Sequence, residues 1–391
     1  MGSAIFLILL PVITPAFPRP VLPWLFPSVA NGGEILSSPE FVDVTVMPDG
    51  HPGLIFVNDL GGGVAETRFK SYFAEYGMHP SQQLSTSSSW YPQIATFQGK
   101  VVAAYVDNRV GSPTYLQLLF RTSADYGASW GSEFVPFGSE TFDTQHLSPL
   151  LVASRDGTKL YVFSCCVSQI PQFRYTTDPT LVIWTAAAAA ASDTSMHVVV
   201  GSDCSTGGNY HIYECERSRN FDFTETATSG QWVYIARADS GYTNGSRGTQ
   251  VGPLGGSWSA QVDHGGTGGY NCCAHGNASL FLDRDGAVYY VRVTPFGEAL
   301  YLQKSVDGGF TWGPQIDAYL PIVSNYTIGS PVGLYVPGYS RGEYIWYAGF
   351  GGENENTMRV IPLWSESLPY SETGTARLFG TLGGDFDFGT A

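Results

Sequence analysis

The sequence predicts an all-β protein, a six-bladed β-propeller of four-stranded antiparallel blades preceded by an extended N-terminal arm. Three observations support this prediction. The 391 residues include 47 glycines and 24 prolines, a content that suits short strands joined by many turns and that long helices tolerate poorly. Short apolar runs that end in turn residues recur along the chain. One turn motif also returns at steps of 50, 53, 61 and 68 residues, a spacing that suits blades of four short strands.

The repeated motif reads S-x-D-x-G-x-[ST]-W and occurs twice in full. Its aspartates are Asp125 and Asp307, which lie 182 residues apart. Weaker copies place an acidic residue at the same position, at Glu75, Asp178 and Asp239. One more step ends near Trp364. Together these positions predict six repeating units.

Strand signals lie upstream of the motif within the units. The predicted strands are residues 92–97, 100–106 and 114–122 in the second unit, 149–154 and 159–164 in the third, 278–282 and 287–293 in the fifth, and 330–336 and 343–350 in the sixth. Turn residues separate them, as expected for antiparallel hairpins. The run Ala186–Ala191 is the exception and indicates a short helix or an insertion in the fourth unit.

The residue types of the motif have a structural explanation. An Asp side chain accepts hydrogen bonds from backbone N–H groups of its own tight turn. Gly permits a positive φ where the hairpin reverses, and Trp supplies a large apolar plate that packs between neighbouring blades. The predicted structural residues are Asp125, Gly127 and Trp130 in one copy and Asp307, Gly309 and Trp312 in the other. The two aspartates are therefore predicted to close hairpins rather than to act as acids.

The two complete copies resemble the Asp-box, or BNR, repeat of the sialidase-like superfamily, which includes sialidases and many non-catalytic propellers. Residues 101–109 resemble the strand that precedes the box in many bacterial BNR repeats. The resemblance covers residues 38–367 and is strongest at the two complete copies. It implies that ligands bind at the funnel mouth, on the face opposite the motif.

The candidate ligand face follows from strand alternation. If each blade runs through strands A to D with the motif between C and D, then the B–C turns and D–A connections lie on the opposite face. The candidate ligand-binding residues on that face are Asp59, Trp90, Tyr91, Asp107, Asn108, Arg109, His275, Glu298 and Glu353. Their acidic and aromatic character favours sugar hydroxyls, a cation or a basic protein patch. The alternative is that they are solvated turn residues, since Asp and Asn are good turn formers.

A sialidase-like enzyme would need three arginines for the substrate carboxylate, a Tyr–Glu nucleophile pair and an Asp acid/base. The arginine motif expected near the start of such enzymes has only a poor match at residues 17–20, before the first blade. The other available arginines lack recognisable flanking motifs: Arg68, Arg109, Arg174, Arg247 and Arg341. No catalytic residue is therefore predicted. The leading hypothesis is non-catalytic recognition of a glycan or a protein surface, or assembly.

The alternative hypothesis is a sialidase-like exo-glycosidase. A glycosidase needs two carboxylates about 5–10 Å apart, and Asp59 and Asp107, on neighbouring blades, are the first pair to test.

Charge and residue spacing argue against several partners. The formal net charge is −15, and only four of the 19 basic residues are lysines. No basic stripe is present, which argues against nucleic acid and against anionic membranes. There is no C-x-x-C zinc spacing and no pair of histidines at helical spacing, so neither a metal nor a cofactor is predicted.

The cysteines and sequons indicate an extracellular protein, whether secreted, on a cell surface or on a virion. Cys204 and Cys215 flank a Gly-rich stretch that would allow a disulfide. The pairing of the other four stays open: Cys165, Cys166, Cys272 and Cys273. Three N-x-[ST] sequons, at Asn244, Asn277 and Asn325, fit an exported chain.

Residues 1–37 form an apolar, proline-rich segment ahead of the predicted propeller, residues 38–391. Ala4–Ile13 is compatible with the apolar core of a signal peptide, with Ser28–Ala30 as the cleavage site, although no Lys or Arg precedes it. It is too short and too rich in proline to span a bilayer. The other interpretation is an arm that docks on a neighbouring subunit and supports homo-oligomer or virion assembly.

Overall fold

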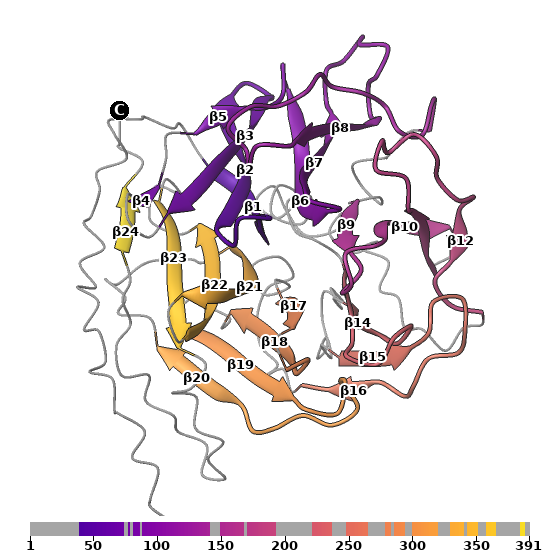
Figure 1. Cartoon of the computed structure of the whole chain (residues 1–391), viewed down its shortest axis with the longest axis vertical. Coiled ribbons are helices and arrows are strands. Elements are labelled where there is room, and N and C mark those ends of the chain that lie inside the picture. Colours follow the sequence, from indigo (N-terminus) through magenta and orange to yellow (C-terminus); the bar gives the residue numbers. More distant parts are fainter. Residues whose placement is uncertain are drawn as a thin grey trace, which may run out of the picture.

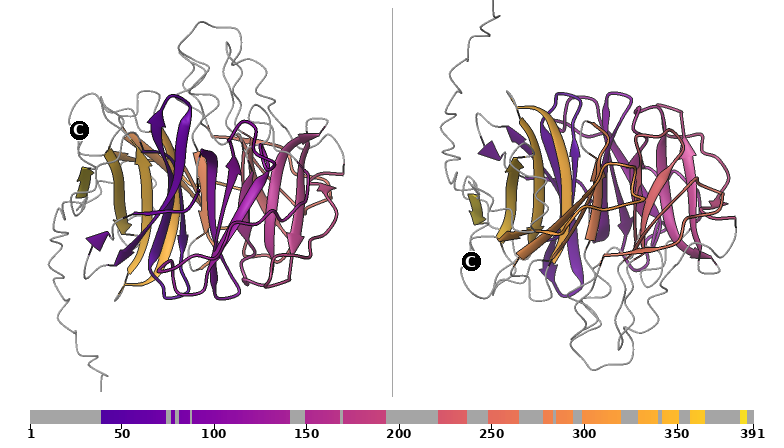
Figure 2. Two further views of the ribbon diagram at one scale, coloured as in Figure 1. Left: turned by 90° about the horizontal axis from the view of Figure 1, so that it is seen from above. Right: turned by 90° about the horizontal axis from the view of Figure 1, so that it is seen from below.

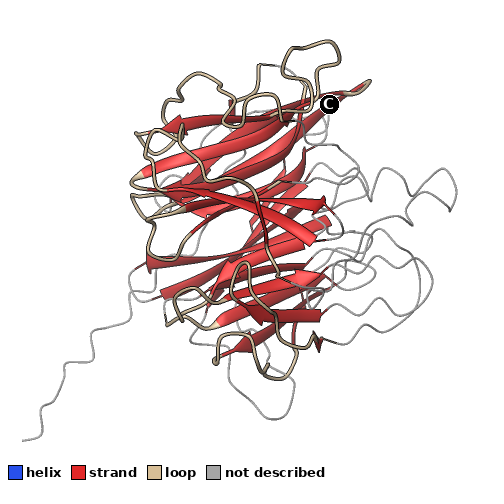
Figure 3. Cartoon of the chain, turned by 90° about the vertical axis from the view of Figure 1, so that its right-hand side faces the viewer, coloured by secondary structure: helices blue, strands red, loops and turns tan. Residues whose placement is uncertain are grey.

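The computed structural model describes residues 39–73, 77–78, 81–86, 88–140, 149–167, 170–192, 221–236, 248–264, 278–282, 285–293, 299–319, 329–339, 342–350, 357–364 and 384–387. These residues form strands, turns and loops without any helix (Figure 3). In this part of the chain, therefore, no helix is suited to crossing a membrane.

The described strands form six antiparallel sheets around a central axis (Figure 1). The first three sheets contain β1 (Pro39–Val46), β2 (Pro52–Gly61), β3 (Val64–Phe73), β4 (Gly77–Met78) and β5 (Gln82–Gln83); β6 (Ser89–Phe97), β7 (Lys100–Asp107) and β8 (Leu118–Ser123); and β9 (Leu150–Ala153), β10 (Leu160–Val167), β11 (Ile170–Thr176) and β12 (Ala188–Ala189). The last three contain β13 (Phe221–Glu225), β14 (Trp232–Ala236), β15 (Gly248–Gly252) and β16 (Val262–Asp263); β17 (Ala278–Leu282), β18 (Val288–Val293), β19 (Ala299–Ser305) and β20 (Ile316–Tyr319); and β21 (Gly329–Tyr339), β22 (Gly342–Phe350), β23 (Thr357–Trp364) and β24 (Gly384–Asp387).

The ring closes through the first strand of each sheet. Strand β1 contacts β6, β6 contacts β9, and the series continues through β13, β17 and β21 back to β1. Each sheet uses one continuous stretch of chain, so β1 and β21 meet by packing and not by sharing a sheet. The prediction of an all-β propeller is confirmed, and six sheets fit the six predicted blades.

The disc has two rims, visible edge-on in Figure 2. Strand order and antiparallel pairing place the A–B and C–D turns on one rim, which we call the turn rim. The B–C loops and D–A connections lie on the other, which we call the loop rim. The predicted motif face therefore corresponds to the turn rim, and the predicted ligand face corresponds to the loop rim.

Predicted and observed strands agree closely in the fifth and sixth sheets, where β17 is residues 278–282 and β22 is residues 342–350. The second sheet differs. The predicted strand 114–122 is wrong in its first part, because backbone hydrogen bonds from Leu116 to Asp107 and from Gln117 to Thr114 curl the chain into a loop before β8. The fourth strand of this sheet is represented by one antiparallel bridge between Phe120 and Phe134.

The alanine run is strand and loop, so the prediction of a helix or insertion there is wrong. Strand β12 is the outer strand of the third sheet, and Ala191 forms a parallel bridge with Gly256 of the fourth sheet. The Ala190 carbonyl accepts a 3.0 Å hydrogen bond from Trp258 Nε1. Ala190 and Ala191 are buried. Small side chains let the outer edges of the two sheets approach this closely.

The predicted motif position Asp239 lies outside the described residues, between β14 and β15 in the sequence. The C–D turn of the fourth sheet instead follows β15, with Pro253 in the Asp position five residues before Trp258. Gly255 has a φ of 75° and stands three residues before the Trp, as in the complete copies. The Gly-x-x-Trp spacing was therefore the sequence signal that could have located the C–D turn of the fourth sheet.

Polar side chains join the first strands of neighbouring sheets at the centre of the ring. Asp43 in β1, Gln93 in β6 and Asp222 in β13 each accept a hydrogen bond from a backbone N–H of the next first strand: Ile94 at 2.8 Å, Leu151 at 3.3 Å and Leu280 at 2.9 Å. All three acceptor side chains are buried. These bonds fix how far one sheet can slide against the next, in addition to the apolar cores between sheets.

Candidate functional site

The complete motif copies lie in C–D turns on the turn rim. The Asp125 carboxylate accepts hydrogen bonds from the Ser129 backbone N–H at 2.9 Å, the Ser129 hydroxyl at 2.6 Å and the Ser123 hydroxyl at 2.7 Å. Asp307 repeats this arrangement with the N–H and hydroxyl of Thr311 and the hydroxyl of Ser305. Each carboxylate is thus bound by its own turn.

Asp178 closes a third such turn, after β11. It accepts hydrogen bonds from Thr180 and from the backbone N–H groups of Val182 and Ile183. Trp184 Nε1 donates to the Leu181 carbonyl at 2.8 Å, as Trp312 donates to Gly309 at 3.0 Å. We call the turns of Asp125, Asp178 and Asp307 the carboxylate turns.

The carboxylate turns pack on the preceding sheet. A Cβ at Gly127 would lie 2.2 Å from the Phe69 ring of the first sheet, and the Trp130 ring meets Phe69 edge-on at 5.0 Å. A Cβ at Gly309 would lie 2.6 Å from Val233 of the fourth sheet. Both glycines have positive φ, 85° and 98°. Conformation and space therefore both require glycine at these two positions.

The pKa values of the turn carboxylates make them poor acids at neutral pH. Hydrogen bonds from Ser129 and Ser123 lower the pKa of Asp125 to about 2, and those from Thr180 lower the pKa of Asp178 to about 2. Burial raises the pKa of Asp307, but hydrogen bonds from Thr311 outweigh it and leave the pKa lowered. A general acid needs a pKa near the working pH, so these groups remain charged acceptors.

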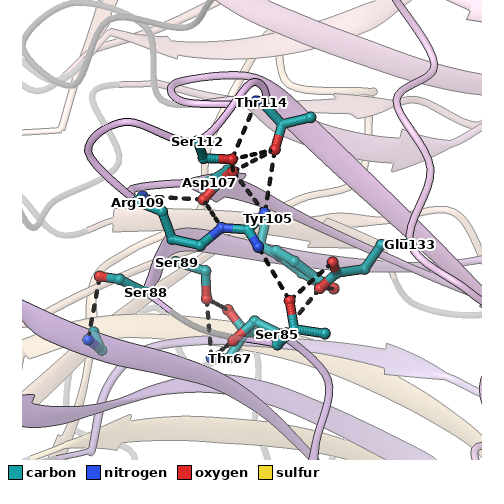
Figure 4. Close-up of polar contacts among 12 residues, drawn as sticks. Thr67, Ser85, Ser88, Ser89, Tyr105, Asp107, Arg109, Ser112, Thr114 and Glu133 are labelled. Carbon is teal, nitrogen blue, oxygen red and sulfur yellow. Dashed lines mark hydrogen bonds and ion pairs between the residues drawn. The ribbon is translucent and has the colours of Figure 1, made fainter.

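On the loop rim, Asp107 anchors the loop that follows β7 (Figure 4). Its buried carboxylate accepts hydrogen bonds from Arg109 Nε at 2.6 Å and Nη2 at 2.7 Å, and also from the Arg109 backbone N–H and the hydroxyls of Ser112 and Thr114. Burial is the largest influence on the pKa of Asp107 and raises it, but the hydrogen bonds outweigh it and lower the pKa. The carboxylate that was predicted to bind ligand is saturated by its own loop.

Ser88 holds this loop against the first sheet. Its hydroxyl donates to the Gly63 carbonyl at 3.1 Å and accepts from the Ala65 N–H at 3.4 Å, while its carbonyl accepts from the Asn108 N–H at 2.9 Å. Gly63 and Ala65 belong to the β2–β3 hairpin, and Asn108 begins the β7–β8 loop. The loops of two neighbouring blades therefore lie side by side on one rigid base, which is our candidate functional site.

A Tyr–Glu pair lies beneath this site but is closed to ligands. Tyr105 donates a 2.8 Å hydrogen bond to Glu133, and Arg121 Nη2 lies 3.9 Å from the same carboxylate (Figure 4 shows the pair). Tyr105 is fully buried, and burial followed by the charge of Glu133 raises its pKa far above the usual value. A nucleophilic phenol needs access and a favourable ionised form, and Tyr105 has neither.

Three of the arginines available to a sialidase-like site are described by the structure, and each is paired with a carboxylate of the chain. Arg68, Arg109 and Arg174 form ion pairs with Glu66, Asp107 and Glu140, respectively. Arg247 and Arg341 lie outside the described residues. The described candidates therefore do not converge on a common anion site.

The remaining predicted ligand-binding residues are not brought together on the loop rim by the described part of the structure. Tyr91, with a φ of 55°, is buried in the core between the second and third sheets, and Trp90 is partly buried against the same core. Asp59 lies in β2, close to the β2–β3 turn, and its side chain is not among those that the structure describes. His275, Glu298, Glu353, Cys204 and Cys215 fall outside the described residues, as do residues 1–37.

His264 is a structural residue between the fourth and fifth sheets. Its ring nitrogens lie 2.9 Å from Thr249 Oγ1 and 2.8 Å from Gln303 Oε1, and the ring stacks on Tyr290. Both nitrogens therefore have partners. Among the residues that the structure describes, no three His, Cys, Asp or Glu side chains are placed to hold a metal ion.

Sequence reasoning missed the exposed apolar tips of the site. Leu60 and Val64 flank the Gly61–Gly63 turn and are 49% and 47% exposed, and Val110 is 87% exposed. Tyr115, on the same loop as Val110, is 37% exposed. An apolar residue on each side of a triple-glycine turn was the available signal, because such residues have little chance of burial at a hairpin tip.

Comparisons with known proteins show the fold. No protein-family model and no curated protein matches the chain. A triple arginine-to-alanine mutant of AofleA from Arthrobotrys oligospora is 9% identical, with a TM-score of 0.57 and 85% of each chain covered. Hadza microbial sialidase Hz136 is 12% identical, with a TM-score of 0.52 over 85% of this chain. Trypanosoma rangeli sialidase in complex with the inhibitor DANA is 12% identical, with a TM-score of 0.51 over 82% of this chain.

The chain spans 64% and 54% of the length of these two sialidase chains. At such identities the likeness shows the architecture alone. The chain shares the β-propeller fold of sialidase-like proteins.

Comparing Gly309→Ala with Gly308→Ala separates the cost of close packing from the cost of an unfavourable backbone conformation. Both glycines have positive φ, but a methyl carbon would lie 2.6 Å from Val233 at Gly309 and no closer than 3.7 Å to Thr226 at Gly308. We expect Gly309→Ala to lower the free energy of unfolding by roughly 1–3 kcal/mol more than Gly308→Ala, as measured by urea denaturation. Equal losses would contradict the tight seating of this turn on the fourth sheet.

Acidification tests the carboxylate turns. The folded-state pKa of Asp125 is about 2, below the value of about 3.9 in unfolded chains. Its contribution to stability is therefore present above pH ~4 and is lost as the pH falls towards ~2. We expect an NMR titration midpoint for the Asp125 carboxyl near pH 2, and Asp125→Asn should make stability less sensitive to acid. A midpoint near pH 4 would show that the turn hydrogen bonds do not form.

Proposed function

We propose that the chain is a non-catalytic recognition or assembly propeller of the Asp-box type, extracellular or on a virion surface, that presents its loop rim to a glycan or a protein. The Asp-box assignment is supported by the three carboxylate turns, whose side chains hold their own hairpins. Ligand contact is assigned to the loop rim, where the Ser88-linked loops stand on a saturated hydrogen-bond network. Rigid scaffolds with variable loops suit recognition.

One observation carries the non-catalytic part of the proposal. The described groups that resemble sialidase machinery are each neutralised by the fold: Tyr105 is buried, and Arg68, Arg109 and Arg174 are paired with carboxylates. Releasing Arg68 or Arg109 would leave the buried carboxylate of Glu66 or Asp107 unpaired, which is costly. The buried phenol and the paired arginines therefore favour a structural role for these residues over a catalytic one.

A sialidase-like glycoside hydrolase is the alternative, and one observation favours it. Two of the similar structures are sialidases. The same observation makes a glycan the first ligand class to test. The suggested carboxylate pair of Asp59 and Asp107 gives this alternative little support, because the Asp107 carboxylate is saturated by donors of its own loop.

Catalysis is tested with a panel of fluorogenic glycosides that includes a sialoside. We expect fluorescence to rise no faster than in buffer. The phenol of Tyr105 is buried, and the candidate substrate-binding arginines are paired with carboxylates of the chain. Release proportional to protein concentration, lost in Tyr105→Phe and retained in Tyr126→Phe, would overturn the non-catalytic proposal. Tyr126 is the matched control because it lies on the turn rim and is 46% exposed.

Binding is tested on a glycan array and then with purified hits. We expect Tyr115→Ala to weaken binding about tenfold, equivalent to ~1.4 kcal/mol, because an exposed aromatic ring offers a stacking surface on the loop rim. Tyr126→Ala, on the opposite rim, should leave affinity unchanged. Equal effects of the two variants, or an effect of Tyr126→Ala alone, would contradict the assignment of the ligand face.

The extracellular assignment rests on the sequons at Asn244, Asn277 and Asn325 and on the Cys204–Cys215 spacing. Expression through a eukaryotic secretory pathway should give a protein whose mass falls after removal of N-glycans. A second mass measurement without reductant should show a disulfide between Cys204 and Cys215. An exported protein with neither feature would contradict this part of the proposal.

A further inference from the structure

Three exposed apolar side chains lie on the two loops that Ser88 joins, and together we call them the tip patch: Leu60, Val64 and Val110. All three are at least 47% exposed, and Val110 is 87% exposed. Ser88 bonds both to the hairpin that carries Leu60 and Val64 and to the loop that carries Val110. The patch therefore spans two blades and is held on a fixed base.

The shape of the backbone turns the patch outwards. A β-bulge between Asp59 and Gly61 sets Leu60 outside the regular pairing of β2 and β3, and bulges redirect side chains in this way. The three glycines of the hairpin have positive φ, and nothing lies within 4 Å of the Cβ position of any of them. The space above the hairpin is open among the described residues.

The chain leading into β1 enters the ring beside this patch. Pro39, the first residue of β1, pairs with Asn58, two residues before Leu60. Because β1 begins at the loop rim, the 38 preceding residues connect there, beside the hairpin of the first blade. An extended chain covers about 3.3 Å per residue, so about ten residues suffice to cross from that point to the neighbouring loop.

The composition of this segment matches the patch. Residues 1–38 are dominated by apolar residues and prolines and contain two charged residues, Arg19 and Glu34, which cancel. The patch itself is uncharged. Three side chains are too few to hold a separate protein, since stable interfaces bury about 800 Å² per partner. A segment tethered beside its site has an effective concentration in the millimolar range and needs far less contact.

We propose that residues 1–38 fold back along the loop rim and dock on the tip patch of their own chain. In this arrangement the arm shields Leu60, Val64 and Val110 from solvent. Ligand contact is left to the neighbouring surface, including Tyr115.

A photo-crosslinking amino acid at position 110 tests the proposal in the full chain, whose intact mass is confirmed before irradiation. We expect the crosslinked product to run as a monomer and to join position 110 to a peptide within residues 1–38. The same label at Val306, 68% exposed on the turn rim, should give at least about tenfold less of that product, since tethering enriches only nearby sites. Products confined to a dimer, or joining position 110 only to other parts of the chain, would overturn the proposal.

Limited proteolysis gives an independent readout. We expect Val110→Ser to speed chymotryptic cleavage after Trp24 about fivefold, because cleavage follows the undocked population, while Val306→Ser leaves the rate unchanged. Equal rates in wild type and both variants would contradict docking at the patch. Native protein that begins at Asn31 would also overturn the proposal, since most of the arm would then be missing.

Discussion

The closed ring depends on hydrogen bonds that cross from one first strand to the next. Asp43, Gln93 and Asp222 are buried, and each accepts a backbone N–H from the neighbouring sheet. Side-chain packing between sheets, by contrast, tolerates sliding. A directed bond to a buried polar atom does not, because an unsatisfied buried acceptor costs about 1–3 kcal/mol. These contacts set the offset between the sheets that they join, and with it the relative height of the turns and loops on those sheets.

The two rims use polar groups differently. On the turn rim, carboxylates such as Asp125 and Asp307 accept bonds from their own turns, and the glycine and tryptophan of each turn seat it on the preceding sheet. On the loop rim, Asp107 holds its own loop together, and Ser88 joins that loop to the β2–β3 hairpin of the neighbouring blade. Among the described residues, the loop rim exposes Val110, which the proposed arm would cover, and Tyr115, which is left for a ligand. Recognition is therefore assigned to exposed side chains outside these hydrogen-bond networks.

Local chemistry made much of the fold predictable. The complete motif repeats carry their own hydrogen-bond partners within four residues, as Asp307 does with Thr311, and strands such as β17 are bounded by clear turn residues. Prediction failed where distant contacts decide the structure. The alanine run resembles a helix until Trp258, 68 residues away, bonds to it. The partners of Tyr105 and Asp43, Glu133 and Ile94, lie 28 and 51 residues along the chain, so neither the buried Tyr–Glu pair nor the bonds between sheets could be seen in a local pattern.

The most direct test of this account is the stability of Asp222→Ala, measured by urea unfolding together with hydrogen exchange at the Leu280 amide. Removing a buried, hydrogen-bonded carboxylate should lower the free energy of unfolding by about 2 kcal/mol and expose the Leu280 N–H to exchange. Asp285→Ala, which removes an exposed carboxylate from the turn between β17 and β18, is the control and should change stability by less than about 0.5 kcal/mol. Equal stability of the two variants, with Leu280 still protected in both, would contradict a ring held in register by bonds between its first strands.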